Sequence, residues 1–300
     1  MQNRICIVTG ANSGIGKATA LGLARQNATV IMVCRNPAKG AAAQQDIIRE
    51  SGNPNVDVMI CDMASQASIR QFATDFQARY DRLHVLLHNA AVNMPTRELT
   101  SDGIETMFAV NHLAPFLLSR LLLDMLLASV PARIVIVSSI VHRTVRVDFD
   151  NLQGEQRFDA WWHYCRTKLM GMLFMHELAH RLEGTGVTAN ALHPGAIRTN
   201  LGHDYGGWMR VFLALVSRFG SSPEKGARTS LYLAMSPEVA GVNGQYFANC
   251  RAVEPADRAR DDAAAQRLWQ ISEQLTHTVT KGVTHVHAAP VPYTRFSNSP

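Results

Sequence analysis

The 300-residue sequence has few charged and few aromatic residues: 18% are Asp, Glu, Lys or Arg, and 7% are Phe, Trp or Tyr. Its 29 basic residues outnumber the 24 acidic ones by only five and form no run of five or six. A nucleic-acid groove needs clustered basic side chains with aromatic ones between them, so we expect no nucleic-acid partner. The scattered charge predicts a solvated surface and one phosphate-bearing ligand.

Cysteine is scarce, and its arrangement does not indicate a disulfide framework. The five cysteines include no CxxC pair, and Cys6, Cys34 and Cys61 lie in apolar, strand-like runs. Such positions are typical of buried free thiols in a reducing compartment.

The sequence also lacks a long uninterrupted apolar run. The longest apolar stretch, 115–130, contains Arg120 and Asp124, which predicts a core helix and not a membrane span. A strand-like pattern begins within the first few residues and leaves no room for a signal peptide. We therefore expect a soluble, cytoplasmic protein.

What the sequence does contain is 47% hydrophobic residues, placed in short apolar runs that alternate with helical patterns. Continuous apolar runs are typical of strands buried on both faces. Strands are expected at 4–9, 29–34, 56–61, 83–88, 133–138, 187–192 and 244–248. Helices are expected at 14–26, 37–51, 65–79, 101–128, 160–184, 224–235 and 257–275. This order predicts an α/β fold: a single-domain, Rossmann-like, doubly wound parallel sheet with helices on both faces.

The helical periodicity stops near residue 275, and no interior linker or repeat interrupts it. We expect one domain over residues 1–275 and a flexible tail over 276–300, which is polar and contains proline.

A glycine-rich turn, TGANSGIG at 9–16, joins the first predicted strand to the first predicted helix. Glycines let the backbone approach a pyrophosphate, and the helix N-terminus offers free N–H groups at the positive end of the dipole. Its place at the first strand–helix junction favours dinucleotide binding over an ordinary turn. The candidate binding residues are Gly10, Asn12, Ser13, Gly14, Ile15 and Gly16.

The end of the second predicted strand, VCRN at 33–36, has no carboxylate. A site for NAD usually holds the ribose 2′-hydroxyl with an acidic residue at this place. Arg35 suits a 2′-phosphate instead, because the planar guanidinium fork matches phosphate. We predict NADP(H) as the cofactor. Lys17 either adds charge nearby or is a solvated helix residue.

Tyr164 and Lys168 lie four residues apart in a helical stretch and so share a helix face. A free phenol, with a pKa of about 10, is a poor proton shuttle at pH 7, and an adjacent ammonium lowers that pKa. A Tyr–Lys pair alone is common on helix surfaces. It gains support from Ser138 and Ser139, which end the fifth predicted strand at the edge where such sheets hold ligands.

The motifs TGANSGIG at 9–16, YCRTK at 164–168 and HPGAIRT at 193–199 together resemble the short-chain dehydrogenase/reductase family, over nearly the whole chain. The stretches 111–123, 133–143, 164–199 and 236–251 are more specifically similar to its retinol dehydrogenase and protochlorophyllide reductase-like branch. Typical microsomal members of that branch carry an N-terminal membrane anchor, which we expect to be missing here.

The resemblance implies a role for each catalytic candidate. Ser139 would hydrogen-bond the substrate oxygen, with Ser138 structural, and Tyr164 would donate the proton. Lys168 would bind the nicotinamide ribose and lower the pKa of Tyr164, and Asn111 would hold a relay water. The further cofactor-binding residues that it implies, beside Tyr164 and Lys168, are Asp62, Asn89, Pro194, Gly195 and Thr199.

The segment HNAA at 88–91 departs from the family's NNAG element, because His88 and Ala91 replace Asn and Gly. We expect His88 to be a structural substitute. His112, His142 and His163 do not have metal-ligand spacing, so we predict no metal site.

These features predict an NADP(H)-dependent oxidoreductase that interconverts a lipophilic aldehyde or ketone and its alcohol. The alternative is a catalytically quiet NADP-binding sensor or scaffold. The substrate is a retinoid-like, steroid, polyketide or other lipophilic compound. The apolar segment 206–219 is expected to be a core or lid helix, with a peripheral membrane contact as the alternative. Pairing through helices 101–128 and 160–184 predicts a homodimer or homotetramer.

Overall fold

The protein is described by a computed structural model over residues 1–195 and 220–278. Its strands form one sheet in the order β3-β2-β1-β4-β5-β6-β7-β8, parallel throughout except for the last pair. The strands are β1 (Ile5–Thr9), β2 (Thr29–Cys34), β3 (Val56–Ile60), β4 (Val85–His88), β5 (Ala132–Val137), β6 (Val187–His193), β7 (Tyr246–Ala248) and β8 (Arg251–Ala252). The predicted doubly wound sheet is confirmed.

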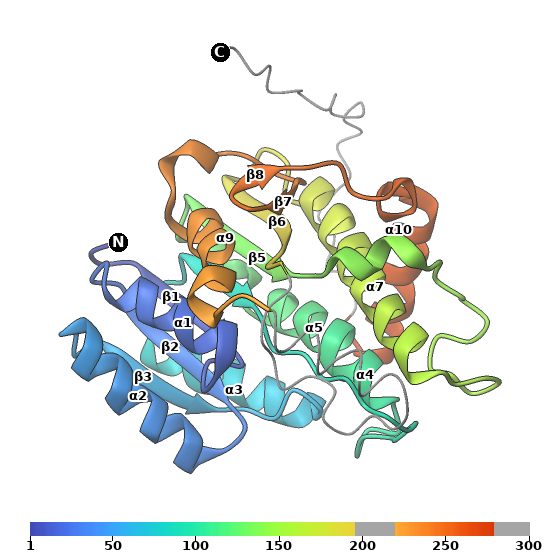
Figure 1. Ribbon diagram of the computed structural model, residues 1–300, viewed down its shortest axis with the longest axis horizontal. Helices are drawn as coiled ribbons and strands as arrows, with labels where there is room; N and C mark the ends of the chain where they lie inside the picture. The colour runs from blue at the N-terminus through green and yellow to red at the C-terminus, as the bar shows by residue number, and fades with distance from the viewer. Residues whose placement is uncertain (196–219, 279–300) are drawn as a thin grey trace.

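Helices cover both faces of this sheet (Figure 1). They are α1 (Gly14–Ala24), α2 (Pro37–Ser51), α3 (Gln66–Arg79), α4 (Thr106–Phe108), α5 (Ala114–Leu121), α6 (Leu123–Leu127), α7 (Ala160–Arg181), α9 (Pro223–Met235) and α10 (Asp262–Leu275). Helices α1, α2 and α9 pack on one face, and α3, α5, α7 and α10 pack on the other.

The apolar strands supply two cores at once, because successive side chains point to opposite faces. In β1, Cys6 and Val8 pack with Leu23 of α1, whereas Ile7 between them packs with Phe116 of α5. Cys6, Cys34 and Cys61 are buried free thiols, as predicted. Burial raises the pKa of the Cys6 thiol to about 12, so this sulfur stays protonated.

The prediction of one helix over 101–128 is wrong. Residues 101–105 form a turn, and α4 begins only at Thr106, where the Glu105 carboxylate accepts hydrogen bonds from the backbone N–H groups of Met107 and Phe108. A π-helical turn, Ala109–Leu113, then separates α4 from α5. Pro115 explains the break, since it has no N–H to continue the regular i to i−4 ladder.

Two further differences lie near the end of the sheet. The strand β8 was not predicted; it pairs antiparallel with β7 through a two-residue turn in which Asn249 and Cys250 both have positive φ. The segment 257–275 is not one helix: residues Asp257–Arg260 form a 3₁₀ turn, and α10 starts at Asp262.

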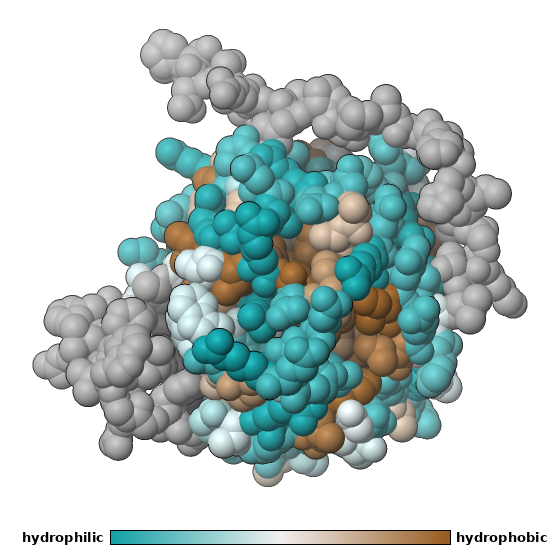
Figure 2. Space-filling view, turned by 90° about the vertical axis from the view of Figure 1, so that its right-hand side faces the viewer, coloured by the Kyte–Doolittle hydropathy of each residue, from teal (hydrophilic) through white to brown (hydrophobic). Residues whose placement is uncertain are grey.

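The last helix, α10, packs against α7 and α5. The Trp269 ring lies 4.9 Å from the Phe116 ring and 6.1 Å from the Phe174 ring, measured between centroids, and the Arg181 guanidinium lies 4.2 Å from the Trp269 ring centroid. This aromatic cluster buries the side chains of Phe116, Phe174 and Trp269. Figure 2 shows the adjoining side of the molecule, where hydrophilic side chains surround separate hydrophobic patches.

Within residues 1–195 and 220–278, every helix is too short or too polar to span a bilayer. The segment 206–219, predicted as a lid or membrane contact, and the tail beyond residue 278 lie outside the described residues.

Candidate active site

The candidate site lies at the point in the sheet where the order of the strands reverses, between β1 and β4. Strands β1 and β4 are neighbours, but the chain continues from β1 toward β2 on one side and from β4 toward β5 on the other. In open α/β sheets, ligands bind at the carboxyl ends of the strands beside such a switch point. The glycine turn, Asn89 and Ser139 follow β1, β4 and β5 at this edge.

The glycine turn brings the start of α1 against the end of β1. Gly10 has a φ of +68°, and a Cβ on Gly16 would lie 2.3 Å from the Gly10 carbonyl oxygen. The N-cap residue Ser13 makes no side-chain capping bond, and the first turn of α1 has no acidic residue. The positive end of the α1 dipole is therefore not compensated by a capping side chain of the helix itself.

Asn89 ties the end of β4 to this turn. Its side-chain amide donates to the Thr9 carbonyl over 2.9 Å, and the backbone N–H groups of Asn89 and Ala90 both donate to the Thr9 hydroxyl over 3.0 Å. His88, just before it, is buried and lies 2.8 Å from the Ser119 hydroxyl. Burial lowers the His88 pKa to about 3, so this ring is neutral and packs as a structural residue.

Arg35 follows β2 directly, and its side chain is exposed. Lys17 is engaged elsewhere: its ammonium forms a 2.7 Å ion pair with Asp46 of α2. Asp62 follows β3, and its carboxylate accepts a 3.0 Å hydrogen bond from the Ala64 N–H. Of these two basic candidates, Lys17 is therefore paired with a carboxylate and half-buried, whereas Arg35 is exposed.

Tyr164 and Lys168 share one face of α7, as their spacing predicts. The Lys168 ammonium lies 5.5 Å from the Tyr164 ring centroid and donates a 3.3 Å hydrogen bond to the Val137 carbonyl at the end of β5. Both side chains are buried. Desolvation lowers the Lys168 pKa to about 8, so the amine is still mostly protonated at pH 7.

Asn111 is held beside this pair by the π-helical turn. Its amide group accepts from the Val92 N–H over 2.8 Å and donates to the Val92 carbonyl over 2.9 Å. The same amide donates to the Thr167 hydroxyl over 3.0 Å, and that hydroxyl donates to the Tyr164 carbonyl over 2.7 Å. Three segments distant in sequence are thus joined at one point.

The two serines after β5 differ in their surroundings. The Ser138 hydroxyl is buried and donates to the Lys168 carbonyl over 3.0 Å, the structural role expected for it. Ser139 caps a 3₁₀ turn, Ile140–Thr144, and its carbonyl lies 2.7 Å from the Nδ1 atom of His142. The other ring nitrogen of His142 accepts from the Ala256 N–H over 3.2 Å, so the ring links Ser139 to the segment before α10.

A buried hydrogen bond between His163 and Glu105 fixes the start of α7. The Nε2 atom of His163 lies 2.8 Å from the Glu105 carboxylate, and neither side chain is exposed by more than 2%. Since Glu105 also caps α4, it connects the residue before Tyr164 to the turn that carries Asn111.

The motif after β6 is described only in part. Gly195 has a φ of +90°, which favours glycine, and its N–H donates to the Nδ1 atom of His193 over 3.0 Å. Pro194 precedes it, and Thr199 lies outside the described residues.

Three contacts were not predicted from the sequence: the hydrogen bonds of Thr167, the bond from His142 to Ala256, and the Glu105–His163 pair. Thr167 lies inside the YCRTK motif, so the motif could have pointed to it. The other two contacts join residues 114 and 58 positions apart, and no spacing rule reaches that far.

Comparisons with known proteins agree with this architecture. The family description "short chain dehydrogenase" matches residues 4–209. The chain is 45% identical over 285 residues to dehydrogenase/reductase SDR family member 13 of Bos taurus, covering 92% of this chain and 74% of that protein. It is 43% identical over 291 residues to human retinol dehydrogenase 14, covering 92% and 87%.

Two solved structures are similar to the fold. An uncharacterized protein from Mycobacterium paratuberculosis has a TM-score of 0.75 and 32% identity, covering 92% of this chain and 94% of that one. A candidate short chain dehydrogenase from Escherichia coli CFT073, complexed with NADPH, has a TM-score of 0.66 and 27% identity, covering 83% and 97%.

The fold and these similarities define an oxidoreductase that acts on CH–OH or C=O groups. The chain belongs to the short-chain dehydrogenase/reductase family, in its retinol dehydrogenase-like branch, and the family uses NAD or NADP.

Proposed function

We propose that the protein interconverts a lipophilic aldehyde or ketone and its alcohol, with NADP(H) as the hydride carrier. The observation that carries this proposal is the buried Tyr164–Lys168 pair on α7, with Asn111 joined to the same helix turn through Thr167. A buried ammonium beside a phenol is the arrangement that brings a tyrosine toward the pKa needed for proton transfer near neutral pH.

The residues at the sheet edge fit a dinucleotide. The turn from Gly10 to Gly16 gives close backbone approach to a pyrophosphate, with the uncompensated N-terminus of α1 beside it. Asp62 and Asn89 would lie along the adenosine, and Pro194, Gly195 and Thr199 near the nicotinamide. When bound, the cofactor supplies or accepts the hydride.

Arg35 supports NADP(H) over NAD(H). Its exposed guanidinium stands directly after β2, where a carboxylate would hold an unphosphorylated ribose. A guanidinium instead pairs with the 2′-phosphate through two charge-assisted hydrogen bonds.

Side chains of the protein then transfer the proton that the substrate oxygen needs. Tyr164 donates it to the substrate oxygen as negative charge develops there, and Ser139 donates a hydrogen bond to the same oxygen. Lys168 holds positive charge next to the phenol, which stabilises the phenolate left behind. Asn111 holds a water that returns a proton to Tyr164.

The proposal of an apolar substrate rests on similarity to the retinol dehydrogenase-like branch of the family. Relatives at 41–45% identity are named retinol dehydrogenases or dehydrogenase/reductase SDR family member 13. A retinoid, a steroid or another apolar carbonyl compound fits that similarity. We propose further that the working unit is one domain of residues 1–275, because α10 completes the core around Trp269.

The test is consumption of NADPH, and separately of NADH, by the full chain with a panel of aldehydes and ketones that includes a retinal, a steroid ketone and short polar aldehydes. We expect turnover with apolar members and preference for NADPH. Tight NADPH binding without turnover across the panel would support the sensor or scaffold alternative instead.

A further inference from the structure

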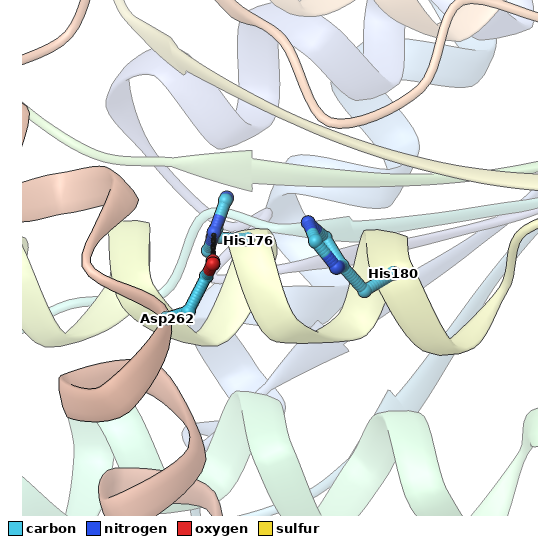
Figure 3. A group of neighbouring side chains, drawn as sticks. All are labelled: His176, His180 and Asp262. Carbon is cyan, nitrogen blue, oxygen red and sulfur yellow. Dashed lines mark hydrogen bonds and ion pairs between the residues drawn. The ribbon is translucent and has the colours of Figure 1, made fainter. Parts of the chain in front are cut away.

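A second group of chemistry-bearing side chains lies away from the active site, between α7 and α10. His176 and His180 project from adjacent turns of α7, and Asp262 is the first residue of α10 (Figure 3). The Nε2 atom of His176 lies 2.6 Å from a carboxylate oxygen of Asp262, and the two imidazole centroids are 4.7 Å apart. One ligand atom from each residue lies within 4.8 Å of the other two.

These three side chains are a ligand set of recognised chemistry. Histidines at positions i and i+4 lie on one helix face, so two imidazole nitrogens converge without any backbone change. Two imidazoles and one carboxylate are ligands typical of Zn²⁺ and its first-row neighbours, whereas Mg²⁺ and Ca²⁺ prefer sites built from oxygen alone.

The site is also accessible. The Asp262 side chain is 67% exposed and that of His176 is 14% exposed, so an ion can enter from solvent and keep water as its remaining ligand. The nearest catalytic candidate on the same helix, Lys168, is eight residues away, which is about 12 Å along the helix axis.

A hydrogen bond between His176 and Asp262 explains only part of this arrangement. Asp262 is favourable at the N-terminus of α10 whether or not a metal binds, because a carboxylate complements the helix dipole there. A hydrogen-bonded His176–Asp262 pair also needs no third member. The His176–Asp262 contact does not explain the position of His180, whose ring lies beside the pair on the next turn of α7.

We propose that His176, His180 and Asp262 bind a divalent transition-metal ion, Zn²⁺ foremost, which cross-links α7 to α10. The ion takes the place of the direct hydrogen bond between His176 and Asp262 and draws the His180 ring into the same coordination sphere. Since α10 packs against α7 through Trp269, the ion adds a second attachment at the start of α10.

The experiment is titration of the metal-free full chain with Zn²⁺ by calorimetry, followed by Co²⁺ absorption spectroscopy. Metal ions that bind only the folded state raise its stability, so 100 times the Kd of Zn²⁺ is expected to raise Tm by on the order of 5 °C. His180→Asn and Asp262→Asn are each expected to raise the Kd at least tenfold and to remove most of the Tm shift.

The matched control is His277→Asn. It removes an exposed histidine in the same way, and Asn tolerates the positive φ at that position. His285→Asn with His287→Asn tests the histidines of the tail. Unchanged affinity in His180→Asn and Asp262→Asn, or loss of affinity in the tail variant instead, would overturn the proposal, as would absence of Zn²⁺ binding to the wild type. None of these readouts depends on the oxidoreductase activity.

Discussion

The side-chain amide of Asn111 donates a 3.0 Å hydrogen bond to the hydroxyl of Thr167, a residue 56 positions later in the chain. That hydroxyl in turn donates to the Tyr164 carbonyl. The π-helical turn and the start of α7 therefore have a fixed relative position, set by a side chain that touches neither substrate nor cofactor in the proposed mechanism.

Replacing Thr167 by Val removes this link while keeping the shape of the side chain. We expect a loss of about 1–3 kcal/mol in the free energy of unfolding, because a buried amide donor loses its acceptor. Since the position of Asn111 is disturbed, kcat should fall several-fold with little change in the KM for substrate. Denaturant unfolding and steady-state kinetics measure the two effects.

Thr19→Val is the matched control. The Thr19 hydroxyl is buried in α1 without a hydrogen-bond partner among the described residues, so its removal should leave stability unchanged or raise it. Equal destabilisation by the two substitutions would show that the link from Asn111 contributes nothing.

Tyr164→Phe should lower kcat by about 10²- to 10⁴-fold, because the proton donor is lost while the ring packing stays. NADPH binding, followed by fluorescence, should change little. Tyr232→Phe removes a phenol on α9 that donates a 2.9 Å hydrogen bond to Glu238, and it should keep full activity. Retained turnover in Tyr164→Phe would contradict the proposed mechanism.

Lys168→Met should make the ligand-free protein more stable at pH 7 while abolishing activity. Burial holds the Lys168 pKa at about 8, below its ordinary value of 10.5. Below pH 8 both folded and unfolded chains bind this proton, so the folded state bears the cost of burying the charge. Between the two pKa values only the unfolded chain keeps the proton, so the contribution of Lys168 to stability rises with pH.

The gain from Lys168→Met should therefore be on the order of 1–2 kcal/mol at pH 7 and shrink toward pH 10. Thermal unfolding at both pH values measures it. A gain that grows with pH would show that the amine is not desolvated as described.

Arg35→Asp should raise the Kd for NADPH about 100-fold, because two charge-assisted hydrogen bonds to the 2′-phosphate are lost and a repulsion is added. Binding of NADH should stay the same or improve. Arg25→Asp makes the same change of charge after α1, where Arg25 is exposed, and should leave the NADPH to NADH ratio unaltered. Equal loss of both cofactors in Arg35→Asp would contradict the assignment of NADP(H).

Gly16→Ala should abolish dinucleotide binding and cost about 1–3 kcal/mol of stability. The added Cβ would lie 2.3 Å from the Gly10 carbonyl oxygen and 2.6 Å from the Asn89 amide nitrogen, so the backbone of the turn would have to shift. Gly171→Ala on α7 meets only Ile136 at 3.8 Å. It should stabilise the helix by up to about 1 kcal/mol, and loss of binding there would undermine the steric argument.

Much of this fold follows from local patterns in the sequence. The strand β1 is apolar from Ile5 to Val8 because both of its faces are buried, and similar apolar runs recur in β2, β4 and β5. The helical spacing of Tyr164 and Lys168 likewise requires only a continuous helix. These features depend on neighbours within a few residues, which is the range that sequence patterns describe.

Other features depend on contacts that only the folded chain makes. The His163–Glu105 pair spans 58 positions, and Asp262 lies 86 positions after His176. The π-helical turn before Pro115 has the same apolar composition as a regular helix, so periodicity could not locate the break. The positions of Arg35, Ser139 and Asp62 relative to a bound cofactor stay predictions.

The packing of Trp269 against Phe116 and Phe174 has a consequence for synthesis of the protein. Helix α7, which carries Tyr164 and Lys168, packs against α10, the last helix in the described chain. A nascent polypeptide that has not reached residue 269 therefore leaves the rings of Phe116 and Phe174 uncovered. A prematurely terminated product would expose that apolar surface, and such exposure makes a chain prone to aggregation and dependent on chaperones.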